Sequence, residues 1–84
     1  MRKSEKQLRE GFDMIRCNIA FLQEQHKTNT ERCATACGIS KVTFCRRLQK
    51  PEEFTIREIE GLARLWNVPA RKIMYGRLAE EVSA

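Results

Sequence analysis

The segment Asn29–Leu48 constrains the fold of this 84-residue chain more than any other. Its residue pattern predicts two short helices, at residues 30–37 and 41–50, joined by a tight turn. Gly38 lets the backbone adopt the left-handed conformation that other residues resist. The hydroxyl of Ser40 can cap the second helix. Two helices joined in this way have the layout of a helix-turn-helix motif.

Small and apolar side chains in this segment fit two helices that cross at close range. Ala34 lies four residues before Gly38, where a larger side chain has no room. Ile39 supplies an apolar anchor within the turn. Phe44 and Leu48 are four residues apart and therefore share one face of their helix, which we expect to point inward.

Three more helices are predicted around this motif. Residues 4–25 form the first, because apolar side chains recur at alternating steps of four and three. These side chains are Leu8, Phe12, Ile15, Ile19 and Leu22. A capping box at Thr55–Glu58 begins the fourth helix. Its expected inward residues are Ile56, Ile59, Leu62, Ala63 and Trp66. Pro69 suits the first position of a fifth helix, and Gly76 either ends that helix or weakens it.

Local signals also set the ends of the central helices. Asn29 is the expected N-cap of the second helix, with Thr28 and Thr30 as alternatives. Pro51 stops the third helix. Because no strand pattern or repeat is found, we expect an all-α fold, a compact bundle of about five helices. It forms a single domain over residues 1–84, with a core at about 5–75 and with 76–84 as a tail or the end of the last helix.

The positive charge of the chain is concentrated on the central segment. The formal net charge is +5. Residues 27–50 contain six basic residues against one glutamate, whereas residues 1–26 and 51–84 are nearly balanced. Because this excess coincides with an independent motif, it favours a polyanionic partner over an ordinary solvated surface.

The remaining composition predicts a cytoplasmic protein. No apolar stretch approaches the roughly 20 residues that cross a membrane. No apolar run follows Arg2 and Lys3, so we expect no secretory signal. The charges of the first helix are mixed rather than strongly basic, which argues against binding to a membrane surface.

From these residues the chain resembles the phage repressor and Cro-like (XRE-type) helix-turn-helix regulators. The resemblance rests on Ala34, Gly38-Ile39-Ser40, Phe44 and Arg46-Arg47-Leu48, followed by residues 50–55. The last run, K-P-E-E-F-T, is similar to prophage-encoded members from Gram-positive bacteria. The resemblance implies a lambda-repressor-like fold that binds double-stranded DNA and regulates transcription, as a repressor. Thr30 departs from the family, because many relatives have a phosphate-contacting Gln at this position.

Helical geometry assigns candidate DNA contacts. With Phe44 and Leu48 buried, side chains on the opposite side of the third helix point outward. The candidates for base contacts are Lys41, Val42 and Arg46. The candidates for phosphate contacts are Lys27, Asn29, Thr30, Thr43, Arg47, Gln49 and Lys50.

Relatives in this family act as dimers, which implies a homodimer here. Its candidate surface is Met74, Tyr75, Leu78 and Val82, although the same residues could equally belong to the core. The main alternative function is a protein-protein interaction module, which would use the helix-turn-helix fold to dock on another regulator. That function predicts an apolar surface instead of a basic third helix.

The four cysteines could form a metal site, but the sequence favours a structural role for Cys33 and Cys37. Cys33 and Cys37 lie one helical turn apart and could share a zinc ion with Cys17, Cys45 or His26. Zinc sites usually contain a second clear ligand pair, and none is present. We therefore expect Cys33 and Cys37 in the core, with no metal and no cofactor. Cys45 lies beside the predicted DNA-binding face, and redox control through its thiol stays an open alternative.

Nothing in the sequence indicates catalysis. His26 is the only histidine and lies in a polar loop. No Ser-His-Asp set, glycine-rich phosphate loop or isolated carboxylate pair is found. We therefore do not expect an enzyme.

Overall fold

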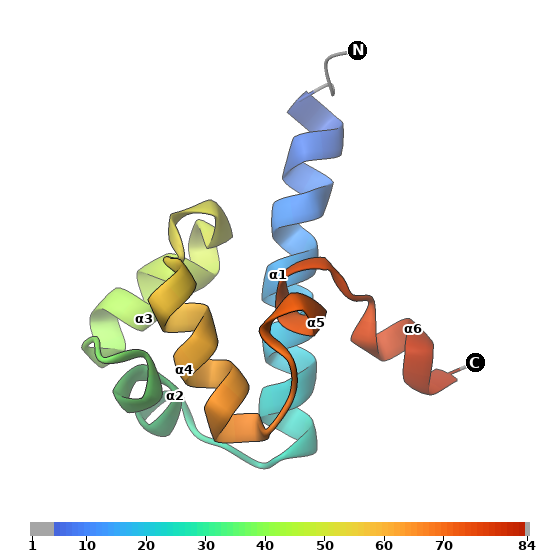
Figure 1. The fold of residues 1–84 in the computed structure, drawn as a ribbon. Helices are drawn as coiled ribbons and strands as arrows, with labels where there is room; N and C mark the ends of the chain where they lie inside the picture. Colours follow the sequence, from blue (N-terminus) through green and yellow to red (C-terminus); the bar gives the residue numbers. More distant parts are fainter. Residues whose placement is uncertain (1–4, 84) are drawn as a thin grey trace.

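The structure is a computed structural model that describes the backbone of residues 5–83 and the side chains of residues 10–80. Six α-helices and one 3-10 turn follow one another within these residues (Figure 1). They are α1 Glu5–Gln25, α2 Thr30–Cys37, α3 Lys41–Gln49, η1 Pro51–Glu53, α4 Ile56–Trp66, α5 Ala70–Tyr75 and α6 Leu78–Ser83. No strand occurs between residues 5 and 83, so the all-α prediction is confirmed.

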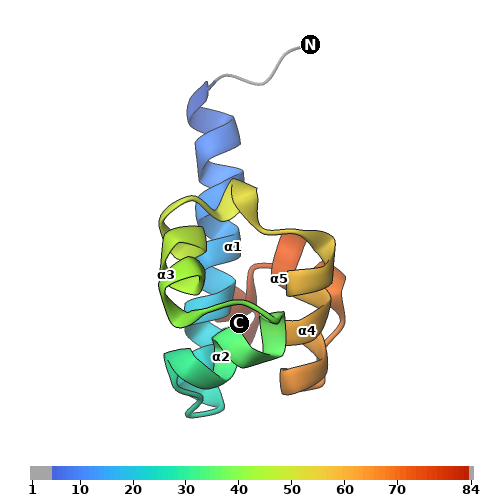
Figure 2. The same ribbon diagram turned by 90° about the vertical axis from the view of Figure 1, so that its left-hand side faces the viewer.

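The helices enclose one core, beyond which the N-terminal half of α1 projects (Figures 1 and 2). The radius of gyration is 12.6 Å, close to the roughly 12 Å expected of a compact chain of this length. Across residues 5–83, no helix combines the length and apolar character needed to cross a bilayer.

Side-chain caps begin α2, α3 and α4 where the sequence predicts. The Asn29 side chain accepts a hydrogen bond from the Arg32 N–H at 2.8 Å, and Ser40 Oγ accepts one from the Thr43 N–H at 3.1 Å. Thr55 and Glu58 form the predicted capping box. Gly38 has φ of 77°, so its left-handed conformation ends α2 at the predicted turn.

The predicted core is confirmed at most positions. The fully or nearly fully buried apolar side chains are Ile19, Leu22, Cys33, Ala34, Cys37, Phe44, Ile59, Leu62, Ala63, Trp66 and Ile73. Ile15, Ile39 and Leu48 are partly buried against them. Phe12 is half-buried, and the side chain of Leu8 lies outside the described residues.

Ile56 is a correction, because this predicted core residue is 67 % exposed. The first turn of α4 presents Glu58 inward instead, only 5 % exposed. Two residues correspond to about 200° around a helix, so Ile56 faces almost the opposite way.

The predicted fifth helix is two helices in the structure. α5 begins at Ala70, with Pro69 as its N-cap rather than its first residue, and ends at Tyr75. Leu78–Ser83 forms the separate helix α6.

The buried side chain of Asn18, on α1, holds this break between α5 and α6. Its amide group donates to the carbonyls of Ile73 at 2.9 Å and Gly76 at 2.8 Å, and accepts from the Leu78 N–H at 3.1 Å. The first two bonds satisfy carbonyls at the end of α5, and the third satisfies an N–H at the start of α6.

The backbones of α2 and α4 meet at Gly61. A Cβ atom at this position would overlap the Ala36 carbonyl, lying 2.9 Å from its carbon atom. Because the obstacle is backbone rather than a flexible side chain, only glycine allows this approach.

We expect Gly61→Ala to lower the free energy of unfolding by about 2 kcal/mol, because the added methyl group must push α2 and α4 apart. Urea denaturation measures this change. Gly11→Ala is the matched control, because a Cβ on Gly11 meets nothing within 4 Å. On α1 it should stabilise by up to about 1 kcal/mol. Equal stability of Gly61→Ala and the wild type would contradict this packing.

Candidate nucleic-acid interface

One side of α3 faces solvent. Phe44 is fully buried beneath the helix. The exposed side chains on the opposite side are Lys41, Val42, Cys45, Arg46 and Gln49, which we call the outer face of α3. Val42 is 64 % exposed, an unusual position for an apolar side chain on a short, otherwise polar face. Figures 1 and 2 show α3 at the edge of the molecule, with α2 beside it.

The charges of the outer face are positive and accessible. α3 contains no acidic residue, and its last turn carries two arginines next to the negative end of the helix dipole. Among the described residues, neither Lys41 nor Arg46 has an ion-pair partner. Lys50 follows as the exposed C-cap. Three cationic side chains are therefore available to an external anion.

Arg47 differs from its neighbours, because its guanidinium is bound within the chain. Its Nε donates to Glu58 Oε1 at 3.1 Å and its Nη2 donates to Glu58 Oε2 at 3.4 Å. Its Nη1 lies 3.8 Å from a carboxylate oxygen of Glu53. The hydrogen bonds to Glu58 raise the pKa of the Arg47 guanidinium above its usual value. We therefore leave the predicted phosphate contact of Arg47 out of the interface.

Most of the remaining phosphate candidates lie around the starts of α2 and α3, and Gln49 and Lys50 lie at the end of α3. Lys27 is exposed with φ of 52°, and its ammonium forms a solvent-exposed ion pair with Glu24 at 2.8 Å. Thr30 and Thr43 are half-buried, Asn29 is exposed, and Gln49 lies near the end of α3. The Thr43 hydroxyl accepts from the Ser40 hydroxyl at 2.9 Å. The first N–H groups of α2 add a partial positive charge at one end of this group.

The cysteines divide into a buried and an exposed pair. Cys33 and Cys37 are buried as predicted, whereas Cys17 and Cys45 are exposed. Burial raises the pKa of the Cys33 thiol to about 11 and that of the Cys37 thiol to about 12, with the Glu58 carboxylate adding to the shift at Cys37. Between residues 10 and 80, no three His, Cys, Asp or Glu side chains are grouped to hold a metal ion.

His26 lies in the loop between α1 and α2. The His26 ring is exposed and stacks on Trp66, with 6.3 Å between ring centroids. The Trp66 indole N–H donates to the Thr28 hydroxyl at 3.1 Å. This contact fixes the loop before α2.

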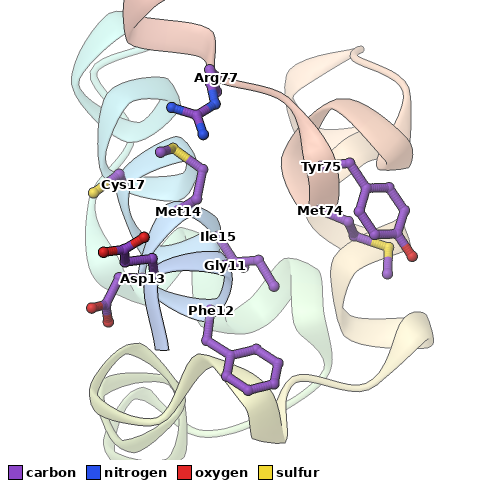
Figure 3. Close-up of a pocket in the computed structure, with 10 residues that line it drawn as sticks. Gly11, Phe12, Asp13, Met14, Ile15, Cys17, Met74, Tyr75 and Arg77 are labelled. Atoms are coloured by element: carbon purple, nitrogen blue, oxygen red, sulfur yellow. The ribbon is translucent and has the colours of Figure 1, made fainter. Parts of the chain in front are cut away.

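A hollow lies between α1 and α5 (Figure 3). Phe12 and Ile15 line one side of this hollow, and Met74 and Tyr75 line the other. Tyr75 is 78 % exposed. Of the other residues predicted for a dimer surface, Met74 and Leu78 are partly buried against the core, and the side chain of Val82 lies outside the described residues.

Sequence reasoning missed the bond between Arg47 and Glu58. The capping box identified Glu58 as an N-terminal residue of α4 but did not show that its carboxylate would be buried. An arginine followed eleven residues later by a glutamate is not a local pattern. The signal in the sequence was therefore limited to the capping box itself.

Comparison with protein-family models, with curated proteins and with solved structures finds no match for this chain.

We expect the free energy of unfolding to fall as pH rises above about 9 and towards 12. The unfolded thiols release their protons at a pKa near 9.0, whereas Cys33 and Cys37 in the folded chain keep theirs up to about 11 and 12. The folded state then binds more protons than the unfolded state, so stability decreases with pH in this interval.

Urea denaturation over this pH range measures the effect. The control is Cys33→Ala/Cys37→Ala, which lacks both buried thiols, so its stability should decline less steeply. Parallel pH profiles for the wild type and this variant would contradict the assignment.

Proposed function

We propose that the chain binds double-stranded DNA sequence-specifically and regulates transcription, as a repressor of the prophage type. In this proposal α2 and α3 form a helix-turn-helix within a lambda-repressor-like fold, and α3 enters the major groove. The observation that carries the proposal is the outer face of α3, which is cationic, free of acidic residues and exposed at the edge of the molecule.

The side chains on this face suit the edges of base pairs. Arg46 can donate two hydrogen bonds to the O6 and N7 atoms of guanine. Lys41, at the start of α3, can donate to the same acceptors or to a phosphate. Contact with a thymine methyl group accounts for the exposure of Val42.

Phosphate contacts then fix the position of the domain. The candidates that remain after Arg47 is set aside are Lys27, Asn29, Thr30, Thr43, Gln49 and Lys50. The N-terminus of α2 also suits a phosphate, through its free N–H groups. The cations available to phosphates are Lys27 and Lys50, with Lys41 as a third. Neutralisation of two or three phosphates gives a slope of about −2 to −3 for log affinity against log salt concentration.

Selection of bound duplexes from a random pool tests the proposal. We expect Arg46→Ala to lose the preference for guanine at one position and to weaken binding to the selected site by about 2 kcal/mol. Arg64→Ala is the control, because Arg64 is an exposed arginine on α4, outside the interface. Identical selected sequences for Arg46→Ala and the wild type would contradict base recognition by α3 through Arg46.

Failure to select any duplex at low ionic strength would overturn DNA binding altogether. It would favour the alternative, docking on another regulator. The exposed apolar side chains of Ile56 and Tyr75 support that alternative.

We also propose that two copies of the chain bind DNA together, with Tyr75 at the contact between them. One small DNA-binding module buries about 600–1,000 Å² of its surface, and a twofold pair doubles this area over two half-sites. Tyr75 protrudes beside the hollow formed by Phe12, Ile15 and Met74 (Figure 3). In a twofold dimer the contact is self-complementary, with Tyr75 of each copy entering the hollow of the other.

Sedimentation equilibrium without DNA should show a concentration-dependent dimer that Tyr75→Ser shifts towards monomer. Val42→Ser is the matched control, because it removes a similarly exposed apolar side chain from α3. It should leave the mass unchanged. A wild-type chain that stays monomeric, or a Tyr75→Ser variant that dimerises normally, would contradict this contact.

A further inference from the structure

The Glu58 carboxylate lies where three helices meet. It belongs to the first turn of α4, binds Arg47 from the last turn of α3, and raises the pKa of the Cys37 thiol at the end of α2. The residue is only 5 % exposed. A buried carboxylate at this junction affects how α2, α3 and α4 are held together.

Both carboxylate oxygens of Glu58 are used. Oε1 accepts from Arg47 Nε at 3.1 Å and from the Thr55 N–H at 3.0 Å, and Oε2 accepts from Arg47 Nη2 at 3.4 Å. The two bonds to the guanidinium are parallel, so the planes of the two groups fix each other's orientation. A buried ion pair of this kind is weak evidence for stability, but it is strongly directional.

Apolar side chains hold α3 against the core. Phe44 lies in the core, and Phe54 packs against its ring edge-to-face at 6.0 Å between centroids. Leu48 is partly buried on the same side. Apolar packing of this kind limits how far α3 can move. The hydrogen bonds to Glu58 add a directional restraint on the side of α3 that carries Arg47.

Arg47 and Arg46 are neighbours on one rigid helix, separated by about 100° around its axis. Restraining Arg47 therefore restrains the rotation of the α3 backbone, and with it the direction of the Arg46 Cα–Cβ bond. Recognition of a base edge requires such directions to be held within about 10–20°.

We propose that Glu58 is a positioning residue for DNA reading: through Arg47 it sets the rotation of α3, and so the angle at which Arg46 meets a base. This inference rests on the proposed function and deepens it. Arg47 then acts inside the fold and neutralises no phosphate.

The experiment compares Arg47→Met/Glu58→Gln with the wild type. The double variant removes both charges together, so no unpaired charge is left buried. The side-chain amide that replaces the carboxylate keeps an oxygen acceptor for the Thr55 N–H. The control is Arg64→Met/Glu60→Gln, which removes the same two charges from exposed positions on α4. Thermal unfolding followed by circular dichroism establishes that each variant is folded.

The readouts are the affinity for the selected duplex, the affinity for a duplex changed at the Arg46 base, and the salt dependence of binding. We expect the ratio of the two affinities to fall about fivefold or more in Arg47→Met/Glu58→Gln. The salt slope should stay unchanged. The control should retain both values.

Two outcomes overturn the inference while leaving DNA binding intact. An unchanged affinity ratio would mean that the ion pair serves stability alone. A salt slope reduced by about 0.9, with equal losses on both duplexes, would make Arg47 a phosphate contact. A wild-type chain that binds no duplex would overturn the proposed function, and this inference with it.

Arg47→Lys is a second variant for the case in which the double variant fails to fold. It keeps the positive charge beside Glu58 but cannot form two parallel bonds. We expect it to lose part of the discrimination without loss of the salt slope. Full discrimination by Arg47→Lys would overturn the positioning role.

Discussion

The close contact between the backbones of α2 and α4 is the constraint on which the rest of the structure depends. Gly61 brings α4 against the Ala36 carbonyl, and the small side chains of Cys33, Ala34 and Cys37 keep the neighbouring layer thin. α2 therefore sits on a rigid support. Because α3 follows directly across the turn at Gly38, the position of its first turn depends on that of α2.

Local signals explain how much of the fold could be predicted. Ser40, Thr55 and Gly38 each act on backbone groups within a few residues, so their effects on helix ends can be deduced from neighbouring residues. The burial of Phe44 and the exposure of Val42 follow from helical periodicity in the same way. The candidate interface was therefore predicted in outline, as an exposed and basic side of one short helix.

The parts that were missed depend on partners distant in the sequence. Asn18 lies 55 residues before Ile73, whose carbonyl it binds, and nothing near Asn18 indicates that pairing. Arg47 was assigned to an external anion because an arginine beside another arginine gives no sign of an internal carboxylate. Ile56 has the spacing of a core residue, but Glu58 occupies the inward position because Arg47 compensates its charge.

The amide of Asn18 also has a consequence for the order in which the chain is assembled during synthesis. The carbonyls and the N–H that it binds belong to residues 73–78, which leave the ribosome long after α1. Until then, a polar group destined for the interior keeps its hydration shell, and α1 lacks its cover from α5. The packing of α1 is therefore completed only after the rest of the core has been synthesised.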